Sequence, residues 1–365
     1  MRIGIVDADL IDKGTRHPNL ALMKLSGWNK EVGNEVSLLE RYEDIPAYDK
    51  VYIGKVFSFT RVPENLHIYH NIQCGGTGFY EDGGDNLPDD IEHHMPDYNL
   101  YNDYINKQIG KGIKREHYSD YLDYSIGFMT RGCFRRCSFC VNKKYDHAFR
   151  HAHVKEFLDE TRPKIYLWDD NVLAYSKWKE VFEELIATGR PFQFRQGMDI
   201  RLMTEEKAEF ISRVKYHGDF IFAFDHIEDK KQIEKNLRIW KKYCKKTTKL
   251  YVLVAYDSQD IRDIVNMMER IKILMKCGCI PYVMRYEAYK SSEFKGLYIQ
   301  IARWCNQPRF YKKMSFRQFC EANQKYHKNP ETICSTLQTL RAFEHDYPDI
   351  AAKYFDLRFE DLRML

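Results

Sequence analysis

Residues 124–140 read Tyr124-Ser-Ile-Gly-Phe-Met-Thr-Arg-Gly-Cys133-Phe-Arg-Arg-Cys137-Ser-Phe-Cys140. The apolar first half predicts a strand that ends at Thr130-Arg131-Gly132, and the short loop after it carries three cysteines spaced C-x3-C-x2-C. Cysteine thiolates bind iron–sulfur clusters and structural zinc, and both groups usually take four protein ligands. A loop with only three can leave one iron of a [4Fe-4S] cluster open. Cys133, Cys137 and Cys140 are therefore the predicted metal ligands.

This spacing, with Phe139 before the third cysteine and a strand in front of the loop, resembles the radical S-adenosylmethionine (radical SAM) superfamily. The resemblance implies that the three cysteines hold a [4Fe-4S] cluster whose open iron binds the amino and carboxylate groups of SAM. It also implies that an electron from the cluster splits SAM into methionine and a 5′-deoxyadenosyl radical. In such enzymes the protein positions the substrate and excludes water, because the cofactor carries the difficult chemistry.

Two other interpretations of the loop remain open. His147, His151 or His153 could complete a zinc site, because all three are near the loop in the sequence. The three cysteines could also be reduced thiols without a metal. Zinc modules usually bring two separate pairs of ligands, whereas this chain has a single set of closely spaced cysteines, which favours the cluster.

Length and charge fit an enzyme. A chain of 365 residues is long enough for two domains and a helical tail. Its 57 basic and 53 acidic residues are nearly balanced, so nucleic acid is not indicated as a partner. The chain starts with a predicted strand instead of a signal peptide and has no apolar run as long as a membrane span. With ten cysteines, we expect a reducing, cytoplasmic environment and no membrane association. The cysteines outside the loop are predicted free thiols: Cys74, Cys244, Cys277, Cys279, Cys305, Cys320 and Cys334.

Residues 1–97 alternate strand and helix, which predicts a Rossmann-like parallel sheet. The expected strands are Arg2–Asp7, Glu35–Leu39, Asp49–Val56 and Ile68–Gln73, with a helix over Asn19–Trp28. This portion resembles the cobalamin-binding-type domain that precedes the barrel in many radical SAM enzymes. That class binds cobalamin through an Asp-x-His-x-x-Gly loop, but the first strand here is followed by Asp7-Ala-Asp9-Leu-Ile-Asp12-Lys-Gly14, without a histidine. We therefore expect the fold without cobalamin.

Residues 98–122 are interpreted as a linker, 123–292 as a partial (β/α)6 TIM-type barrel and 293–365 as a helical C-terminal region. The fold class is thus α/β. The six expected barrel strands are Tyr124–Thr130, Lys164–Trp168, Phe192–Gln196, Asp219–Phe224, Lys249–Ala255 and Ile280–Arg285.

Polar residues follow these strands, where parallel βα folds place their chemistry. By resemblance, Asp169, Asp170 and Asn171 fall where the segment after the second strand contacts the amino group of SAM. Gln196, Asp199 and Arg201 fall where the third strand holds the ribose or carboxylate of SAM. The structural alternative is that Asp199 and Arg201 form an ion pair and that Asp170-Asn171 starts a turn. The residues left to face the substrate are Asp225, Tyr256, Arg285 and Tyr286.

The substrate is predicted to be a small polar molecule, and the narrower hypothesis is a nucleobase or deazaguanine cleaved by a queuine lyase-like reaction. An electron donor such as flavodoxin or ferredoxin is the expected protein partner. Two alternatives remain: a radical SAM modifier of transfer RNA or peptide, and a non-catalytic zinc-binding protein.

Overall fold

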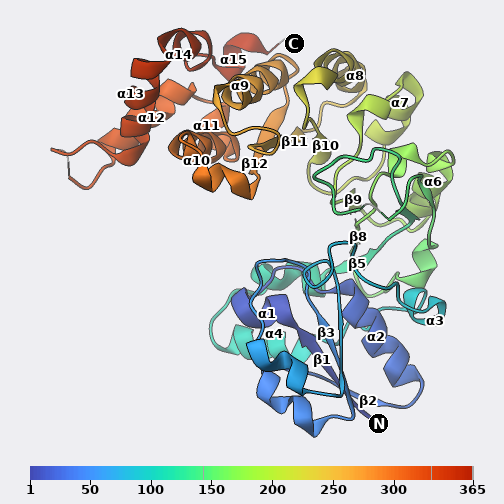
Figure 1. Cartoon of the computed structure of the whole chain (residues 1–365). Coiled ribbons are helices and arrows are strands. Elements are labelled where there is room, and N and C mark those ends of the chain that lie inside the picture. Colours follow the sequence, from blue (N-terminus) through green and yellow to red (C-terminus); the bar gives the residue numbers. More distant parts are fainter. Residues whose placement is uncertain (143, 330, 364–365) are drawn as a thin grey trace. The chain divides into compact units, whose positions relative to one another are not determined.

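The computed structural model describes residues 1–142, 144–329 and 331–363. The chain divides into two compact units, Met1–Gln196 and Gly197–Leu365 (Figure 1). This division falls between the third and fourth strands expected for the barrel. The expected domain boundaries at 97, 122 and 292 stay predictions.

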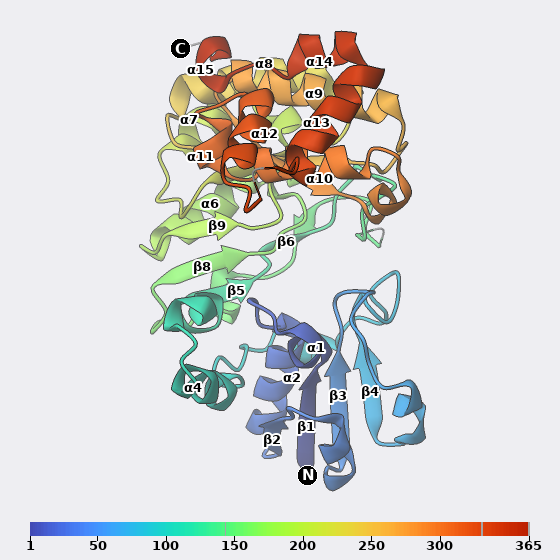
Figure 2. The same ribbon diagram turned by 90° about the vertical axis from the view of Figure 1, so that its left-hand side faces the viewer.

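The N-terminal sheet of the first unit consists of β1 (Arg2–Asp7), β2 (Glu35–Leu38), β3 (Lys50–Gly54) and β4 (Ile72–Gly75). Their spatial order is β2-β1-β3-β4 and every neighbouring pair is parallel, as Figure 2 shows. Ile5 lies opposite Leu38 on one side and Tyr52 on the other. Parallel strands need crossover connections, which the helical segments between these strands provide. The predicted parallel Rossmann-like sheet is therefore present.

Both faces of this sheet are buried, because alternate residues of each strand point to opposite sides. On one face Ile3, Ile5 and Tyr52 pack with the helix α2 (Leu20–Glu31). On the other face Val51 and Ile53 pack with the 3-10 helices η1 (Tyr42–Ala47) and η2 (Glu64–Ile68).

The segment 98–122, expected to be a linker, is helical and contributes to the core of the N-terminal sheet. It contains α4 (Asn102–Gly110), η3 (Arg115–Tyr118) and α5 (Ser119–Leu122). Its buried side chains, which pack in the same core as Ile3 and Ile5, are Tyr98, Leu100, Tyr101, Ile105, Tyr118 and Tyr121. Large aromatic side chains bury much apolar area each, which explains why this polar-looking segment is held in place.

A second parallel sheet in the first unit has the order β5-β8-β9, formed by β5 (Tyr124–Gly127), β8 (Lys164–Leu167) and β9 (Phe192–Phe194). The helix α6 (Trp178–Ala187) covers one face, where Phe182 packs against Phe192 and Phe194. After β5, the short strand β6 (Thr130–Arg131) pairs in antiparallel fashion with β7 (Phe149–Arg150).

The second unit contains a parallel sheet of order β10-β11-β12, formed by β10 (Phe220–Ala223), β11 (Thr248–Val254) and β12 (Ile280–Arg285). The helices between these strands are α8 (Lys230–Tyr243) and α9 (Ile261–Lys276), and α7 (Glu205–Ser212) precedes β10. In β11 the burial alternates residue by residue, so one face is buried and the other is partly open. All six strands expected for the barrel exist, as two three-stranded sheets; a single partial barrel stays a prediction.

The C-terminal region is helical, as expected, and follows β12 (Figure 1). Its main helices are α10 (Lys295–Cys305), α11 (Pro308–Tyr311), α12 (Phe316–Lys325), α13 (Ser335–Asp346), α14 (Pro348–Tyr354) and α15 (Phe359–Leu362). The helix expected over Pro330–His345 begins at Ser335, and Pro330 lies outside the described residues. No described helix combines the length and the apolar composition that crossing a membrane requires.

Candidate metal centre

The three motif cysteines lie on the loop that joins β6 to β7. Thr130 is paired with Arg150 and Arg131 with Phe149, so the base of the loop is fixed by a short antiparallel ladder. The loop leaves the carboxyl end of β5, the end at which parallel βα folds place their chemistry. Cys133, Cys137 and Cys140 are all partly exposed.

Glycine is required where the loop begins. Gly132 has a φ of +88°, and a β-carbon on it would lie 2.0 Å from the backbone oxygen of His147. Just before the loop, a β-carbon on Gly127 would lie 2.4 Å from the ring of Phe157. At Gly132 both the backbone conformation and the close approach require glycine. At Gly127 the close approach alone requires it. The two ends of the cysteine loop are thereby brought together directly before Cys133.

Asp169, which follows β8, holds the chain between β5 and the loop. Its carboxylate accepts hydrogen bonds from the backbone N–H of Met129 (3.1 Å) and from the backbone N–H (2.5 Å) and hydroxyl (2.7 Å) of Thr130. Asp169 is buried, and burial raises its pKa to about 6 in spite of these three donors. It is placed as a structural support of the loop base; its expected role in binding SAM stays a prediction.

The next two residues continue this support toward the cysteines. Asp170 accepts a hydrogen bond from the backbone N–H of Gly132 at 2.7 Å, and burial raises the pKa of its carboxyl. The side-chain amide of Asn171 donates to the sulfur of Cys133 at 3.3 Å. Three consecutive residues after β8 thus hold successive points of the loop, from Met129 to Cys133.

The sulfur of Cys133 also accepts a hydrogen bond from the backbone N–H of Arg135 at 3.4 Å. Hydrogen bonds to cysteine sulfur are a known means of tuning iron–sulfur centres. Between the other two cysteines, the backbone N–H of Cys140 donates to the carbonyl of Cys137 at 3.0 Å, which forms a tight turn. The donor set therefore fits a cluster with three protein thiolates.

The zinc interpretation of the loop stays a prediction. Among the residues that the structure describes, no group of three or more His, Cys, Asp or Glu side chains lies close enough to hold one metal ion. Zinc requires its ligands around a single centre, whereas a cluster distributes its thiolates over different irons.

The histidines that could have completed a zinc site have carboxylate partners. His147 pairs with Asp146 at 2.9 Å, His151 with Glu92 at 3.0 Å and His153 with Glu184 at 3.2 Å. Burial alone would raise the pKa of Glu92, but its hydrogen bond with His151 and the Lys24 ammonium 2.9 Å away lower it to about 2.

The residues after the third strand that were expected to bind SAM differ in their surroundings. Gln196 is exposed. In the second unit, Asp199 and Arg201 form an ion pair at 2.7 Å, and Arg201 also pairs with Asp229 at 2.7 Å. Burial alone would lower the pKa of Arg201, but the two carboxylates raise it. The ion pair named as the structural alternative is present, and binding of SAM by these residues stays a prediction.

Asp225 lies at the carboxyl end of β10 and accepts a hydrogen bond from the backbone N–H of Leu253 at 3.1 Å. Beneath it, the buried guanidinium of Arg270 donates to the carbonyls of Phe224 (3.0 Å), Asp225 (2.7 Å) and Leu253 (2.9 Å). Burial raises the pKa of Asp225. Arg270 therefore joins the ends of β10 and β11, a role that sequence analysis missed because α9 shows only an amphipathic pattern.

The other candidate substrate residues lie at the ends of β11 and β12. The rings of Tyr256 and Tyr286 are edge to face with centroids 4.8 Å apart. The guanidinium of Arg285 lies over the ring of Tyr289, 4.6 Å from its centroid. Ala255, directly before Tyr256, is buried and has a φ of +60°, an uncommon conformation for a residue with a side chain. Strained backbone of this kind gathers at functional sites.

No protein-family model matches the chain, and no curated protein matches its sequence. Solved structures do match. A structure of the radical S-adenosylmethionine methyltransferase TsrM from Kitasatospora setae, with cobalamin and a [4Fe-4S] cluster bound, aligns with a TM-score of 0.51 and 11% sequence identity over 78% of this chain and 74% of that chain. TsrM with tryptophan substrate and the SAM analog aza-SAM gives a TM-score of 0.52 and 12% identity over 77% and 72%. The chain shares the TsrM fold. The α/β fold class predicted from the strand pattern is confirmed.

The N-terminal sheet of this chain does not fit cobalamin at its carboxyl edge. Strand β1 runs directly into the helix α1 (Ala8–Lys13). Asp9 accepts hydrogen bonds from the backbone of Val56 at 2.7 Å and from the hydroxyl of Thr60 at 2.5 Å. A β-carbon on Gly76 would lie 2.3 Å from the backbone oxygen of Lys55. The connections after β1, β3 and β4 therefore contact one another at this edge of the sheet. Cobalamin has no part in the function proposed below.

Proposed function

We propose that this protein is a radical SAM enzyme in which Cys133, Cys137 and Cys140 bind a [4Fe-4S] cluster. The observation that carries the proposal is the support of the cysteine loop by three consecutive residues after β8, with the amide of Asn171 on the sulfur of Cys133. When bound, such a cluster supplies the electron that cleaves SAM into methionine and a 5′-deoxyadenosyl radical.

The side chains of the first unit would orient the loop and the cofactor. Asp169 and Asp170 hold the loop backbone, which fixes the direction of Cys133. The side-chain oxygen of Asn171 is buried and has no hydrogen-bond partner among the described residues. A buried acceptor without a donor is costly, and a ligand ammonium would satisfy it. This supports the proposal that Asn171 contacts the amino group of SAM.

We extend the proposal to hydrogen abstraction from a small, polar, planar substrate, with a nucleobase or deazaguanine as the narrower hypothesis. The edge-to-face pair of Tyr256 and Tyr286 provides aromatic surface at the ends of β11 and β12, and aromatic pairs suit planar rings. Asp225 and Arg285 would provide polar contacts from neighbouring strand ends. TsrM, which shares the fold, has a structure with tryptophan, which carries a planar indole ring, as substrate.

The test of the cofactor is anaerobic reconstitution with iron and sulfide. The wild-type protein should bind about four irons, show a broad visible absorption and, with SAM and a reductant such as reduced flavodoxin, release 5′-deoxyadenosine. Cys137→Ala should abolish deoxyadenosine formation. Cys74→Ala, which alters a partly buried thiol of β4 outside the loop, should behave as wild type. A colourless wild-type protein that binds zinc and leaves SAM intact would overturn the proposal.

The test of the substrate is deuterium transfer. Candidate nucleobases and deazaguanines, deuterated at their aliphatic positions, are incubated with the reconstituted protein, SAM and reductant. Deuterium in 5′-deoxyadenosine identifies a substrate whose C–H bond is attacked. Deoxyadenosine without deuterium from every candidate, together with methylation of a substrate, would reject hydrogen abstraction but keep the radical SAM assignment.

A further inference from the structure

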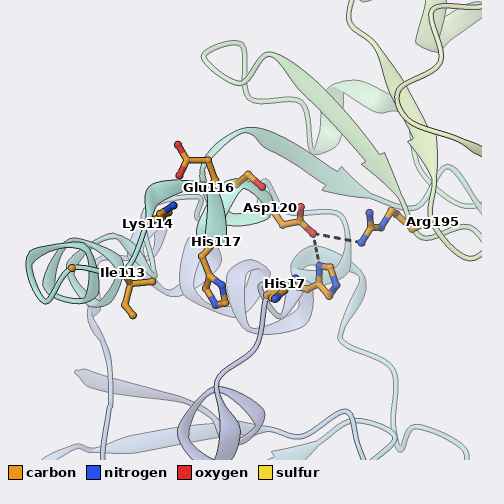
Figure 3. A pocket seen from close by; sticks show the side chains of 10 residues that line it. His17, Ile113, Lys114, Glu116, His117, Asp120 and Arg195 are labelled. Carbon is orange, nitrogen blue, oxygen red and sulfur yellow. Dashed lines mark hydrogen bonds and ion pairs between the residues drawn. The ribbon is translucent and has the colours of Figure 1, made fainter. Parts of the chain in front are cut away.

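The first unit contains a cavity of about 590 Å³ that none of the roles described above uses. Its walls come from three segments: Arg16 and His17 after α1, residues 112–120 before β5, and Arg195 after β9. Pockets of this volume take small organic ligands. Figure 3 shows the lining side chains.

One wall of the cavity is a network of charged groups. Asp120 lies between His17 and Arg195 and pairs with both, at 3.7 Å from the Arg195 guanidinium (Figure 3). Arg195 also lies over the ring of Tyr166, 4.5 Å from its centroid, and His17 is edge to face with Trp168. These contacts fix the positions of the Arg195 guanidinium and the His17 ring. They also balance the charge of Asp120, so that this carboxylate does not oppose an incoming anion.

The cavity is also lined by basic groups without such balance. Arg16 and Lys114 are exposed, and within the described part of the chain neither side chain has a carboxylate partner. His117 and Ser119 line the same cavity. The carboxylate of Glu116 is directed away from Asp120 and Arg195 (Figure 3).

We propose that this cavity is a binding site for a small anion that bears a phosphate or carboxylate group. The lining holds three permanently charged cations against two carboxylates, and one of those carboxylates is already paired with a cation of the cavity. Guanidinium groups bind phosphate and carboxylate oxygens through paired N–H donors, and a lysine ammonium adds a mobile charge. Ser119 offers a hydroxyl donor to the same oxygens. All the lining residues lie outside the cysteine loop, so binding at this site can be tested separately from the iron–sulfur cluster.

The proposal is tested on the anaerobically purified full chain with two probes, inorganic phosphate and citrate, by isothermal titration calorimetry. The variant Arg16→Gln/Lys114→Gln should bind the preferred probe about tenfold more weakly, because two unpaired cations are removed. The control Lys111→Gln/Lys155→Gln removes two exposed lysines outside the cavity and should bind as wild type. Preference for phosphate or for citrate assigns the class of the anionic group.

Two results would overturn the proposal: no binding of either probe by the wild-type protein, or equal loss in the test and control variants, which would indicate non-specific attraction to surface charge. Circular dichroism checks that both variants fold. If the test variant does not fold, the single variant Ser119→Ala takes its place, with an expected severalfold loss of affinity. Iron content is measured in parallel and should be the same in all variants, so failure of this proposal and failure of the cofactor proposal are distinguishable.

Discussion

At the scale of single residues, the hydrogen bond from Asn171 to Cys133 connects the support of the loop with redox chemistry. Hydrogen bonds to cluster sulfurs stabilise the reduced, more negative state. Asn171→Ala should therefore lower the midpoint potential of the reconstituted cluster by on the order of tens of millivolts while iron content is retained. A redox titration followed by electron paramagnetic resonance measures this shift. Asn65→Ala, an exposed change in η2, is the control. An unchanged potential in Asn171→Ala would show that the amide does not act on the sulfur of the bound cluster.

A second residue-scale prediction concerns Asp7, the last residue of β1. Burial raises its pKa to about 6 from an ordinary value of 3.8, although Tyr101 donates to it at 2.8 Å and the backbone N–H of Leu10 at 3.1 Å. Because the folded state binds this proton more tightly than the unfolded state, its stabilising contribution is complete below about pH 4 and is lost as the pH rises to about 6.

Asp7→Asn removes this proton equilibrium. The stability advantage of wild type over Asp7→Asn should therefore shrink by about 2 kcal/mol between about pH 4.5 and about pH 7, as measured by urea unfolding. Asp90→Asn, on the exposed side of α3 (Asp89–Glu92), should follow wild type at both pH values. An advantage that stays constant with pH would mean that Asp7 is not protonated more readily in the folded state.

The residue types of the site could be predicted, but their contacts could not. The spacing of Cys133, Cys137 and Cys140 is local in the sequence and needs only one loop. The contact of Asn171 with Cys133 joins residues on two different strand ends, and its position after a strand indicates only that it lies near the site. Asp169 gave the same positional signal as Asn171, yet its carboxylate binds the backbone of Met129 and Thr130 whereas the amide of Asn171 binds the sulfur of Cys133, a difference that depends on side-chain packing.

At the scale of elements, the hairpin of β6 and β7 determines where the cysteines lie. Gly132→Ala should destabilise the protein by about 1–3 kcal/mol more than Gly189→Ala and lower its iron content after reconstitution. Both glycines have a positive φ, +88° and +68°, but a β-carbon on Gly132 collides with the backbone of His147 whereas one on Gly189 has nothing within 4 Å. Urea unfolding and iron analysis measure the two effects. Equal behaviour of the two variants would mean that the collision is relieved without cost.

The long elements were predictable because their patterns are strong. Strand β12 has the expected bounds, and β11 differs by one residue at each end. The pairing of β6 with β7 was not predicted, because a two-residue strand leaves no periodic signal and is defined by a partner strand that follows it at residues 149–150. The helices of 98–122 were missed because they are short and rich in polar residues, although Tyr101, Ile105 and Ile109 recur at helical spacing.

At the scale of the whole molecule, the N-terminal sheet and residues 98–122 form one folding unit. A fragment of residues 1–97 should lack a cooperative thermal transition, because it loses the six buried side chains that the segment from Tyr98 to Tyr121 adds to the core of β1 and α2. A fragment of residues 1–196, which contains the complete first unit, should unfold cooperatively. Circular dichroism melting compares the two. A cooperative transition of the shorter fragment would show that its core is sufficient without the aromatic segment.

The support of the cysteine loop also has an entropic consequence. Ordering the backbone of one residue costs about 1–2 kcal/mol, and the bonds from Asp169 and Asp170 order the chain from Met129 to Gly132 during folding. This part of the conformational-entropy cost is therefore compensated during folding, before iron binds. Cluster assembly then has to order only the remainder of the loop, so the free energy of folding and the affinity for iron are coupled through two carboxylates that do not bind metal.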